Sequence, residues 1–505
     1  MSRPRRFPSF PLLSLCAAGS LPAALRRRVF GNWGAQGLGM MARIIEQFLL
    51  VPIFLHAWGR DATSCWVTLW AGAAILSLLD CGIAPSFATS VHQARLRGDL
   101  SDVSRQRGQA LGLSGLIATC AALAFVLPLL LLGSSSGAAH LLAFLPVGLP
   151  SADAARVLAL VGLANLLTVP AQSLQGFYRA QEVYGRGEVI FALFSLTQTA
   201  LIASLASLGG SPIACAALLP LMAALYGGVM LLDQRRYGWP SLRLSLPPHH
   251  ALRPLARRCT ALVLPIVSNM ALVQLPILLL GLLGGDPTAP LLYATTRTLV
   301  GAGRQGASLG ATAAAVEQSR LEIRAEVPLA AGLFSATARS LGWLTGLAEG
   351  GVALVGAAFL QFWTRGALSL DPVLTSALLL AALATTPLQG AAAALRFSPS
   401  PKPLIQAALL SLCLCLILLP PAILWGGGPG ASLAVGLSEV SGLGLVASLS
   451  CCRRLDLPLG RHLLQAWGSA LAGFALILAS GLMLAALSGL SPQQTGLAAW
   501  KIGPW

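Results

Sequence analysis

A small set of ionisable side chains lies inside long apolar stretches of this chain. On insertion scales such a residue costs about 2.5–3.5 kcal/mol at the centre of a membrane helix, so each is a candidate for function. These residues are Arg43, Glu46, Asp80, Arg297, Arg304, Glu349 and Glu439. The arginines stay charged and bind phosphate through paired hydrogen bonds. A pathway that contains them suits an anionic substrate, whereas a pathway for organic cations is expected to favour acids and aromatic rings.

The carboxylates among these residues are candidates for binding a proton or a sodium ion. Glu46 lies three residues after Arg43, so the two side chains share one helix face. An ion pair within the helix that neutralises both charges is the alternative. Glu349 and Glu439 have no evident partner in the sequence, so each either couples transport to an ion or stays protonated and inert.

Two glutamines and five prolines complete the candidate pathway. Gln172 and Gln389 are polar enough to meet sugar hydroxyls, although packing between helices is the simpler role for them. Prolines inside apolar segments are expected to bend or break helices beside a cavity. They are Pro85, Pro170, Pro265, Pro276 and Pro387.

The composition indicates which elements hold these residues. The chain is 56% hydrophobic and only 10% charged, with a mean hydropathy of +0.76, which predicts a polytopic membrane protein. Stretches long enough to span a bilayer fall near 33–57, 63–88, 109–132, 155–177, 188–208, 211–232, 259–283, 289–314, 338–362, 373–395, 404–425, 429–450 and 464–488. Long apolar runs of this kind predict helices, because the strands of a β-barrel would be short and alternating.

The positive charge of the chain follows its predicted topology. The net charge of +16 would suggest nucleic acid in a soluble protein, but most of the basic residues fall on one predicted side of the membrane. With the amino terminus in the cytoplasm, only Arg60, Arg156, Arg365 and Lys501 fall outside. This is the positive-inside pattern, so no nucleic-acid partner is implied. Residues 1–30 are expected to form a basic cytoplasmic extension.

The second half of the chain repeats the first. Thr168, Pro170, Gln172 and Arg179 recur 217 residues later, as Thr385, Pro387, Gln389 and Arg396. Similar ordered matches join the regions near 52 and 276, 93 and 318, and 235 and 453. We predict two six-helix lobes, 31–232 and 259–450, joined by a cytoplasmic linker 233–258 and followed by an accessory helix and tail 451–505. Because six is even, the lobes are related by a pseudo-two-fold axis along the membrane normal, an arrangement typical of transporters.

Comparison of the repeats places opposite charges at equivalent positions. An offset of 224 residues carries Asp80 onto Arg304. Two interpretations are open: a static clasp between the lobes, or a gate that closes in one state and breaks in the other.

The sequence gives no sign of a cofactor. It has no glycine-rich nucleotide loop with Lys and Ser or Thr, and no metal-ligand spacing among its cysteines. We therefore expect no enzyme activity and no resident metal, and any uphill transport must use an ion gradient or consumption of the product.

Several short motifs resemble a known family. The stretch Gly31-Asn-Trp-Gly-Ala-Gln-Gly37-Leu-Gly39 with Arg43 resembles the first helix of the O-antigen and polysaccharide flippases of the MATE-like multidrug/oligosaccharidyl-lipid/polysaccharide (MOP) superfamily. The run Leu78-Leu79-Asp80-Cys81-Gly82 is similar to the second helix of that family, and Tyr293-Ala-Thr-Thr-Arg297 to the eighth.

This resemblance implies flipping of a polyprenyl-pyrophosphate-linked oligosaccharide across a bacterial cytoplasmic membrane by alternating access. Its implied partners are membrane lipid, the anionic glycan, a proton or Na⁺, and polysaccharide polymerases or glycosyltransferases. A cation-coupled drug exporter and a lipid II flippase are the alternatives with the same fold. A membrane glycosyltransferase or polymerase is the alternative from another class, although the large external loop or surface acid that such enzymes need is not evident.

Overall fold

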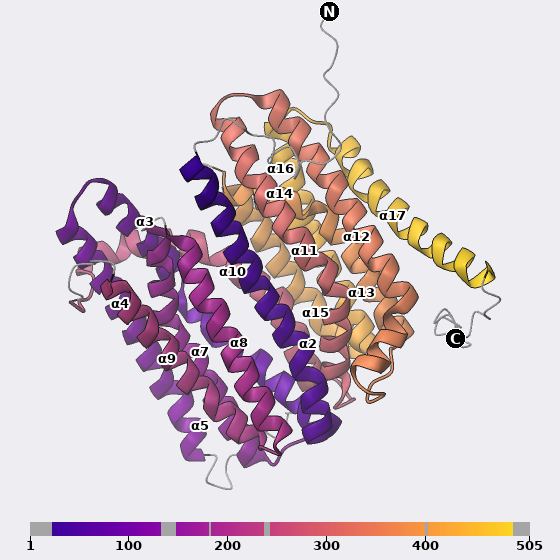
Figure 1. The fold of residues 1–505 in the computed structure, drawn as a ribbon, viewed down its shortest axis with the longest axis horizontal. Helices are drawn as coiled ribbons and strands as arrows, with labels where there is room; N and C mark the ends of the chain where they lie inside the picture. Colours follow the sequence, from indigo (N-terminus) through magenta and orange to yellow (C-terminus); the bar gives the residue numbers. More distant parts are fainter. Residues whose placement is uncertain (1–22, 133–147, 181–182, 237–242, 399–401, 488–505) are drawn as a thin grey trace, which may run out of the picture.

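The computed structural model describes residues 23–132, 148–180, 183–236, 243–398 and 402–487. These residues form helices and no strand, as the composition predicts. Figure 1 shows the first half of the chain, indigo to magenta, beside the second half, orange to yellow. Most of the predicted extension 1–30 and all of the tail after 487 lie outside the described residues.

The first lobe, here called the N-lobe, contains the helices before the linker. They are α2 (Ala23–Ala74), the 3₁₀ turn η1 (Ile75–Asp80), α3 (Ile83–Leu96), α4 (Leu100–Ala121), the π-helical η2 (Ala122–Val126), α5 (Leu127–Leu132), α7 (Ser151–Ala180), α8 (Tyr184–Ser207) and α9 (Pro212–Arg236). Within this lobe α7 packs against α9, α3, α4 and α2, and α8 packs against α2.

The second lobe, here called the C-lobe, follows the linker. Its elements are α10 (His249–Leu283), α11 (Ala289–Ile323), α12 (Val327–Trp363), α13 (Pro372–Thr385), the 3₁₀ turn η3 (Thr386–Leu388), α14 (Gln389–Arg396), α15 (Lys402–Glu439), the π-helical η4 (Val440–Val446) and α16 (Ala447–Arg454). The accessory helix α17 (Leu459–Leu487) comes after it.

The helices account for the thirteen predicted spans. Ten helical stretches of the described residues are long and apolar enough to cross a membrane. Two of them, Gly37–Arg95 and Lys402–Arg454, have 59 and 53 residues and far exceed a bilayer core of about 30 Å. Each changes direction at a glycine with positive φ, Gly59 at 82° and Gly427 at 53°, so each makes two spans. With α11 added, whose polar residues lower its hydropathy, the total is thirteen.

Two hydrogen bonds join the lobes near the end of the bundle that holds Gly59. Ser64 Oγ donates to the carbonyl of Pro287 at 2.5 Å, and Trp363 Nε1 donates to the carbonyl of Phe48 at 2.6 Å. A shared apolar cluster of Leu55, Leu291 and Leu360 lies between these bonds. We call the opposite end, where Arg95, Arg105, Arg236, Arg320 and Arg454 lie, the basic end.

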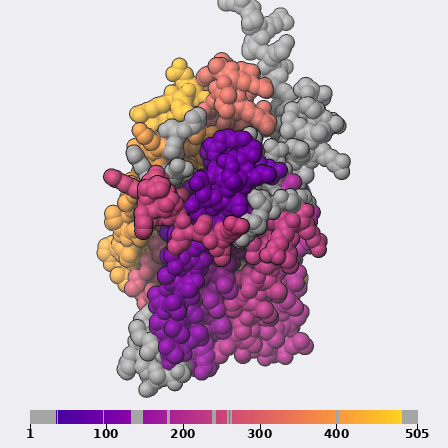
Figure 2. All heavy atoms as spheres, turned by 90° about the vertical axis from the view of Figure 1, so that its left-hand side faces the viewer, coloured from indigo at the N-terminus to yellow at the C-terminus, as the bar shows by residue number. Residues whose placement is uncertain are grey.

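The linker continues the N-lobe at the basic end. Ser245 N donates to the carbonyl of Gly108 on α4 at 3.3 Å. A Cβ at Gly108 would lie 1.9 Å from the carbonyl oxygen of Arg243, and one at Gly112 would lie 2.3 Å from that of Ser245. Figure 2 faces this side of the N-lobe. The linker segment 243–248 is therefore packed against α4.

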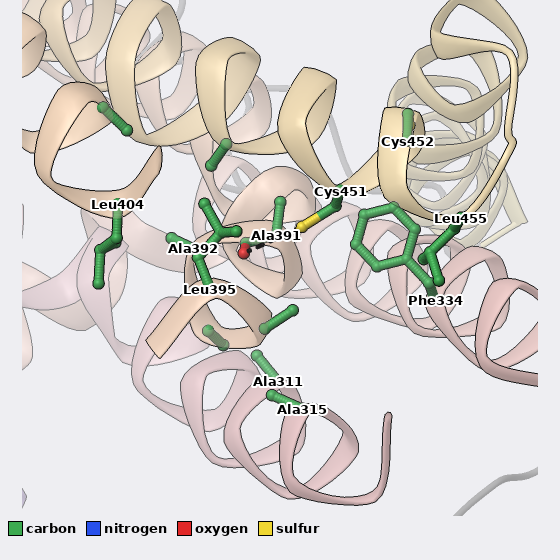
Figure 3. Packing of buried hydrophobic residues seen from close by; sticks show 14 of the residues in the cluster. Ala311, Ala315, Phe334, Ala391, Ala392, Leu395, Leu404, Cys451, Cys452 and Leu455 are labelled. Carbon is green, nitrogen blue, oxygen red and sulfur yellow. Dashed lines mark hydrogen bonds between the residues drawn. The ribbon is translucent and has the colours of Figure 1, made fainter. Parts of the chain in front are cut away.

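The C-lobe core at the basic end contains many small residues beside its larger ones. Ala391 and Ala392 on α14 face Cys451 on α16 and Ala311 on α11, as Figure 3 shows. Small side chains let the short helix α14 sit between α11 and α16. This packing fixes Gln389, the first residue of α14, beside α11.

The accessory helix is bound tightly to α12. A Cβ at Gly342 would lie 2.0 Å from Ser469 Oγ, one at Gly346 2.1 Å from the carbonyl oxygen of Ala470, and one at Gly350 2.9 Å from Ile477 Cβ. These glycines recur every four residues, so one bare face of α12 receives α17 (Figure 1). The thirteenth span is thus a fixed part of the C-lobe.

The prolines act in different ways. Pro387 lies within η3, where the helix tightens between α13 and α14. Pro85 lies in the first turn of α3, directly after the break at Cys81 and Gly82. Pro170, Pro265 and Pro276 lie inside helices that continue through them.

Candidate functional site

A cavity of about 1180 Å³ opens within the N-lobe. It is lined by residues of α2, η1, α3, α7, α8 and α9, and by Met270 of α10. Its ionisable and amide-bearing side chains are Arg43, Glu46, His92, Asn165, Gln172, Gln175, Tyr184, Glu188, Gln198 and Tyr226. The sequence candidates Arg43, Glu46 and Gln172 are therefore brought together here.

Arg43 is a cavity cation with no carboxylate partner among the described residues. Its guanidinium carbon lies 5.5 Å from the centre of the Phe191 ring, and its Nε makes a long bond of 3.4 Å to the carbonyl of Gly39. Arg43 and Glu46 make no direct ion pair within 4.0 Å in this conformation, although the charge of Arg43 still acts on the Glu46 carboxylate. The guanidinium is held over an aromatic face and keeps donors for another group.

The two cavity carboxylates are bonded to neutral donors. Ser195 Oγ lies 3.5 Å from Glu46 Oε2, and Gln175 Nε2 donates to Glu188 Oε1 at 3.1 Å. A Cβ at Gly39 would lie 3.3 Å from Glu188 Oε2, so this glycine makes room for the carboxylate beside α2. Each carboxylate retains acceptor capacity, which suits the hydroxyl groups of a ligand.

Sequence reasoning missed part of this lining. Glu188 is the first residue of the predicted span 188–208, so the sequence does not place it inside the membrane. Gln175 lies three residues after the predicted Gln172, and Gln198 lies on a helix for which no site residue was predicted. Only the arrangement of the helices shows that both side chains line the cavity. The available signal for Glu188 was its place at the end of an apolar run with few other charges.

Apart from Asp80, the remaining charged candidates lie in the C-lobe. Arg304 on α11 forms a two-pronged pair with Glu439 at the end of α15, with Nη1 2.8 Å from Oε2 and Nη2 bonded to Oε1. Gln389, with its amide oxygen turned toward Arg304, accepts from Nε at 2.7 Å. The Glu439 side chain is 8% exposed and that of Arg304 is 33% exposed. Glu439 thus has a partner that the sequence did not reveal.

Arg297 and Glu349 lie near this group but bind differently. Arg297 Nη1 donates to the carbonyl of Val273 on α10 at 2.6 Å and so ties α11 to α10. Glu349 is fully buried, and neither of its carboxylate oxygens has a hydrogen-bond partner in the described structure. A Cβ at Gly303 would lie 3.6 Å from Glu349 Oε1, which places the carboxyl against α11 one residue from Arg304.

Asp80 does not meet Arg304 in this structure. The Asp80 Oδ1 atom accepts from the backbone N–H of Ala84 at 3.1 Å, and the carboxylate is 7% exposed. It therefore satisfies the start of α3 after the break at Cys81 and Gly82, both of which have positive φ. The static clasp between Asp80 and Arg304 is wrong for this conformation, because Arg304 is engaged by Glu439 within its own lobe.

The equivalent glutamines differ in their surroundings. Gln172 lines the N-lobe cavity, whereas Gln389 accepts from the Arg304 guanidinium. The two lobes therefore use equivalent positions for different chemistry. The first lobe has an open cavity with several polar side chains, and the second has a hydrogen-bonded cluster of charged side chains.

No protein-family model and no curated protein matches the chain. Solved structures do resemble it. An inward-facing MATE multidrug transporter of the MOP superfamily aligns with a TM-score of 0.64 and 11% identity, over 83% of this chain and 96% of that one. The lipid II flippase MurJ, in an inward closed conformation, aligns with a TM-score of 0.63 and 11% identity, over 94% and 96%.

A third similar structure is a MOP-superfamily transporter from Pyrococcus furiosus, described as having a binding pocket of reverse polarity. It aligns with a TM-score of 0.61 and 13% identity, over 87% of this chain and 96% of that one. At these identities the likeness concerns the fold. The chain is an all-helical membrane protein with the fold of the MOP-superfamily transporters.

Proposed function

We propose that this protein is a flippase that moves an anionic lipid-linked oligosaccharide across the bacterial cytoplasmic membrane by alternating access. The observation that carries the proposal is Arg43, a guanidinium without an ion-paired carboxylate in the described structure, which lines a large cavity of mixed polar and apolar side chains. A cation left unpaired at membrane depth is costly unless an anion visits it. A pyrophosphate linkage or an acidic sugar supplies such an anion.

The rest of the cavity supports a sugar headgroup. Pockets for drug-sized ligands measure about 300–1,000 Å³, and this cavity of about 1180 Å³ is larger. Its amides donate and accept, while Glu46 and Glu188 accept, which matches the mixed needs of sugar hydroxyls. The polyprenyl chain remains in the bilayer while the headgroup crosses.

The C-lobe cluster supplies a coupling element in this proposal. Glu349, buried without a hydrogen-bond partner in the described structure, lies beside the Arg304–Glu439 pair. Binding of a proton or Na⁺ at Glu349 or Glu439 changes the charge that Arg304 meets and so favours one lobe arrangement over another. The glycosyltransferases that build the lipid-linked glycan and the polymerase that consumes it are the expected partners.

Binding to the purified protein tests the proposal. The full-length chain in nanodiscs is titrated with a polyprenyl-pyrophosphate oligosaccharide, with the same lipid lacking the sugar, and with a cationic drug. We expect the glycolipid to bind at least tenfold more tightly than the cation, and Arg43→Ala to remove about 1.5–3 kcal/mol of that binding. Arg156→Ala is the matched control, because Arg156 pairs with Asp153 near the Gly59 end, away from the cavity.

The competing functions give different results when lipid II and a labelled sugar donor are tested beside these ligands. Preferential binding of the cation, unchanged in Arg43→Ala, contradicts a flippase and supports a drug exporter. Binding of lipid II alone among the polyprenyl lipids narrows the substrate to a peptidoglycan precursor. Incorporation of labelled sugar by the purified protein would revive the glycosyltransferase alternative.

A further inference from the structure

A second cavity, of about 730 Å³, lies between the first turns of α17 and the first half of α12 at the basic end. Its polar lining consists of Ser335 and Arg339 from α12 and Arg461, His462 and Gln465 from α17. None of its lining side chains is acidic. It shares no residue with the N-lobe cavity or with the Arg304–Glu439 cluster.

His462 is the buried polar group of this cavity. It is 3% exposed, and neither Nδ1 nor Nε2 has a hydrogen-bond partner in the described structure. The imidazole lies flat on Phe334, with ring centres 4.5 Å apart and an interplanar angle of 7°. Figure 3 shows Phe334 beside Leu455, within the packed C-lobe core. Burial of an imidazole without hydrogen bonds costs free energy, and a ligand that bonds to one of its nitrogens would offset that cost.

The two arginines add charge at the mouth of the same cavity. The side chains of Arg339 and Arg461 are exposed, and neither forms an ion pair with a described carboxylate. His462 N bonds to the carbonyl of Pro458 in the first turn of α17, a helix of 29 residues whose amino end carries partial positive charge. The second cavity is thus lined by two guanidinium groups and the amino terminus of a helix. Groups of this kind bind phosphate.

The depth of the cavity fits a lipid headgroup. Arg339 is the second residue of the apolar stretch 338–362, and Arg461 lies three residues before the stretch 464–488. Both therefore sit at one boundary of the membrane, and by the positive-inside pattern this is the cytoplasmic boundary. The rest of the wall is apolar, with Leu329, Leu333 and Leu457, which suits the glycerol and upper acyl chains of a lipid.

We propose that this cavity binds the phosphate headgroup of an anionic glycerophospholipid from the cytoplasmic leaflet. Arg339 and Arg461 contact the phosphate, and His462 donates a ring N–H to a phosphate or glycerol oxygen. The bound lipid bridges the accessory helix to α12 at the end opposite the close approach of Gly350 and Ile477. The site is independent of the transported substrate.

A lipid titration tests this site. The full-length protein in detergent is titrated with phosphatidylglycerol, with phosphatidylcholine of the same acyl chains, and with inorganic phosphate, and bound lipid is counted by native mass spectrometry. Phosphatidylglycerol is expected to bind at least about tenfold more tightly than phosphatidylcholine. The double variant Arg339→Ala/Arg461→Ala should lose roughly tenfold to thirtyfold of that affinity.

Two further variants separate a built site from general basicity. Arg324→Ala/Arg453→Ala removes the same charge from exposed positions at the basic end outside the cavity, and should change the affinity less than twofold. His462→Phe keeps the stacking on Phe334 but removes both nitrogens, and should weaken phosphatidylglycerol several-fold. Where the Arg339→Ala/Arg461→Ala variant does not fold, the single variants Arg339→Gln and Arg461→Gln replace it.

Several results overturn the proposal. Equal affinity for the two lipids, equal losses in the two double variants, or unchanged binding in both His462→Phe and the Arg339/Arg461 variants would each do so. Displacement of the lipid by millimolar inorganic phosphate would assign the site to a soluble anion instead.

Discussion

The contact between α12 and α17 makes a sharp prediction about Gly346. An alanine Cβ there would lie 2.1 Å from the carbonyl oxygen of Ala470 and 2.7 Å from Phe474 N, whereas real contacts of this kind are at least 3.0 Å. Because both of these atoms belong to the backbone of α17, a side-chain rotation cannot relieve the clash, and α17 must move away by about 1 Å. Overpacking of this kind costs about 1–3 kcal/mol.

Gly351 on the same helix provides the matched control, because a Cβ there meets nothing within 4 Å. Both substitutions gain about 1 kcal/mol of helix propensity, so the difference between Gly346→Ala and Gly351→Ala isolates the steric cost. A chain of 505 residues has an unfolding entropy of about 1 kcal/mol/K, so the midpoints should differ by about 1–3 °C. Thermal unfolding of the two variants in one detergent measures this difference, and equal midpoints would refute the tight packing of α17 on α12.

Three other predictions concern the charged residues. Glu439→Gln removes the carboxylate that Arg304 binds and should lower the free energy of unfolding by about 2–4 kcal/mol. Glu317→Gln, at an exposed pair with Arg320, should change it by less than about 1 kcal/mol. Chemical denaturation in mixed micelles compares the two variants, and equal effects would contradict a strong Arg304 pair. Asp80→Asn should keep transport within about twofold, because Asn also caps helices, whereas Asp80→Ala should lose about 1 kcal/mol of stability. A stable Asp80→Asn variant without transport would contradict a purely capping role for Asp80 and favour the gate. Glu349→Gln should fold at least as well as the wild type and remove the dependence of flipping on an ion gradient in proteoliposomes, and an unchanged dependence would exclude Glu349 from coupling.

Much of the fold could be predicted from the sequence because membrane helices are long and apolar. The thirteen spans and the two-lobed arrangement follow from hydropathy and from the repeat. The positions of the kinks at Gly59 and Gly427 were also within reach, since each separates two apolar runs. The close packing of the linker on Gly108 and Gly112 was not, because a glycine in a helix does not reveal which neighbour approaches it.

The charged residues were harder to pair than to find. Arg43, Glu46 and Gln172 share the N-lobe cavity, as a common pathway requires. Arg304 was matched with Asp80 because equivalent positions carried opposite charges, yet it binds Glu439, more than a hundred residues away on a helix of its own lobe. Repeat symmetry relates positions between lobes, whereas ion pairs depend on which helices pack within a lobe. Asp80 shows the same limit, since its bond to Ala84 depends on a local break in the helix.

The most direct test of the proposed function is the affinity of the purified protein for a polyprenyl-pyrophosphate oligosaccharide, measured for the wild type, Arg43→Lys and Arg43→Ala. If the unpaired guanidinium in the N-lobe cavity receives the anion, binding should weaken by about tenfold to a hundredfold in Arg43→Ala and by less in Arg43→Lys, which keeps the charge but loses the paired donors. Identical affinities for all three proteins would contradict it.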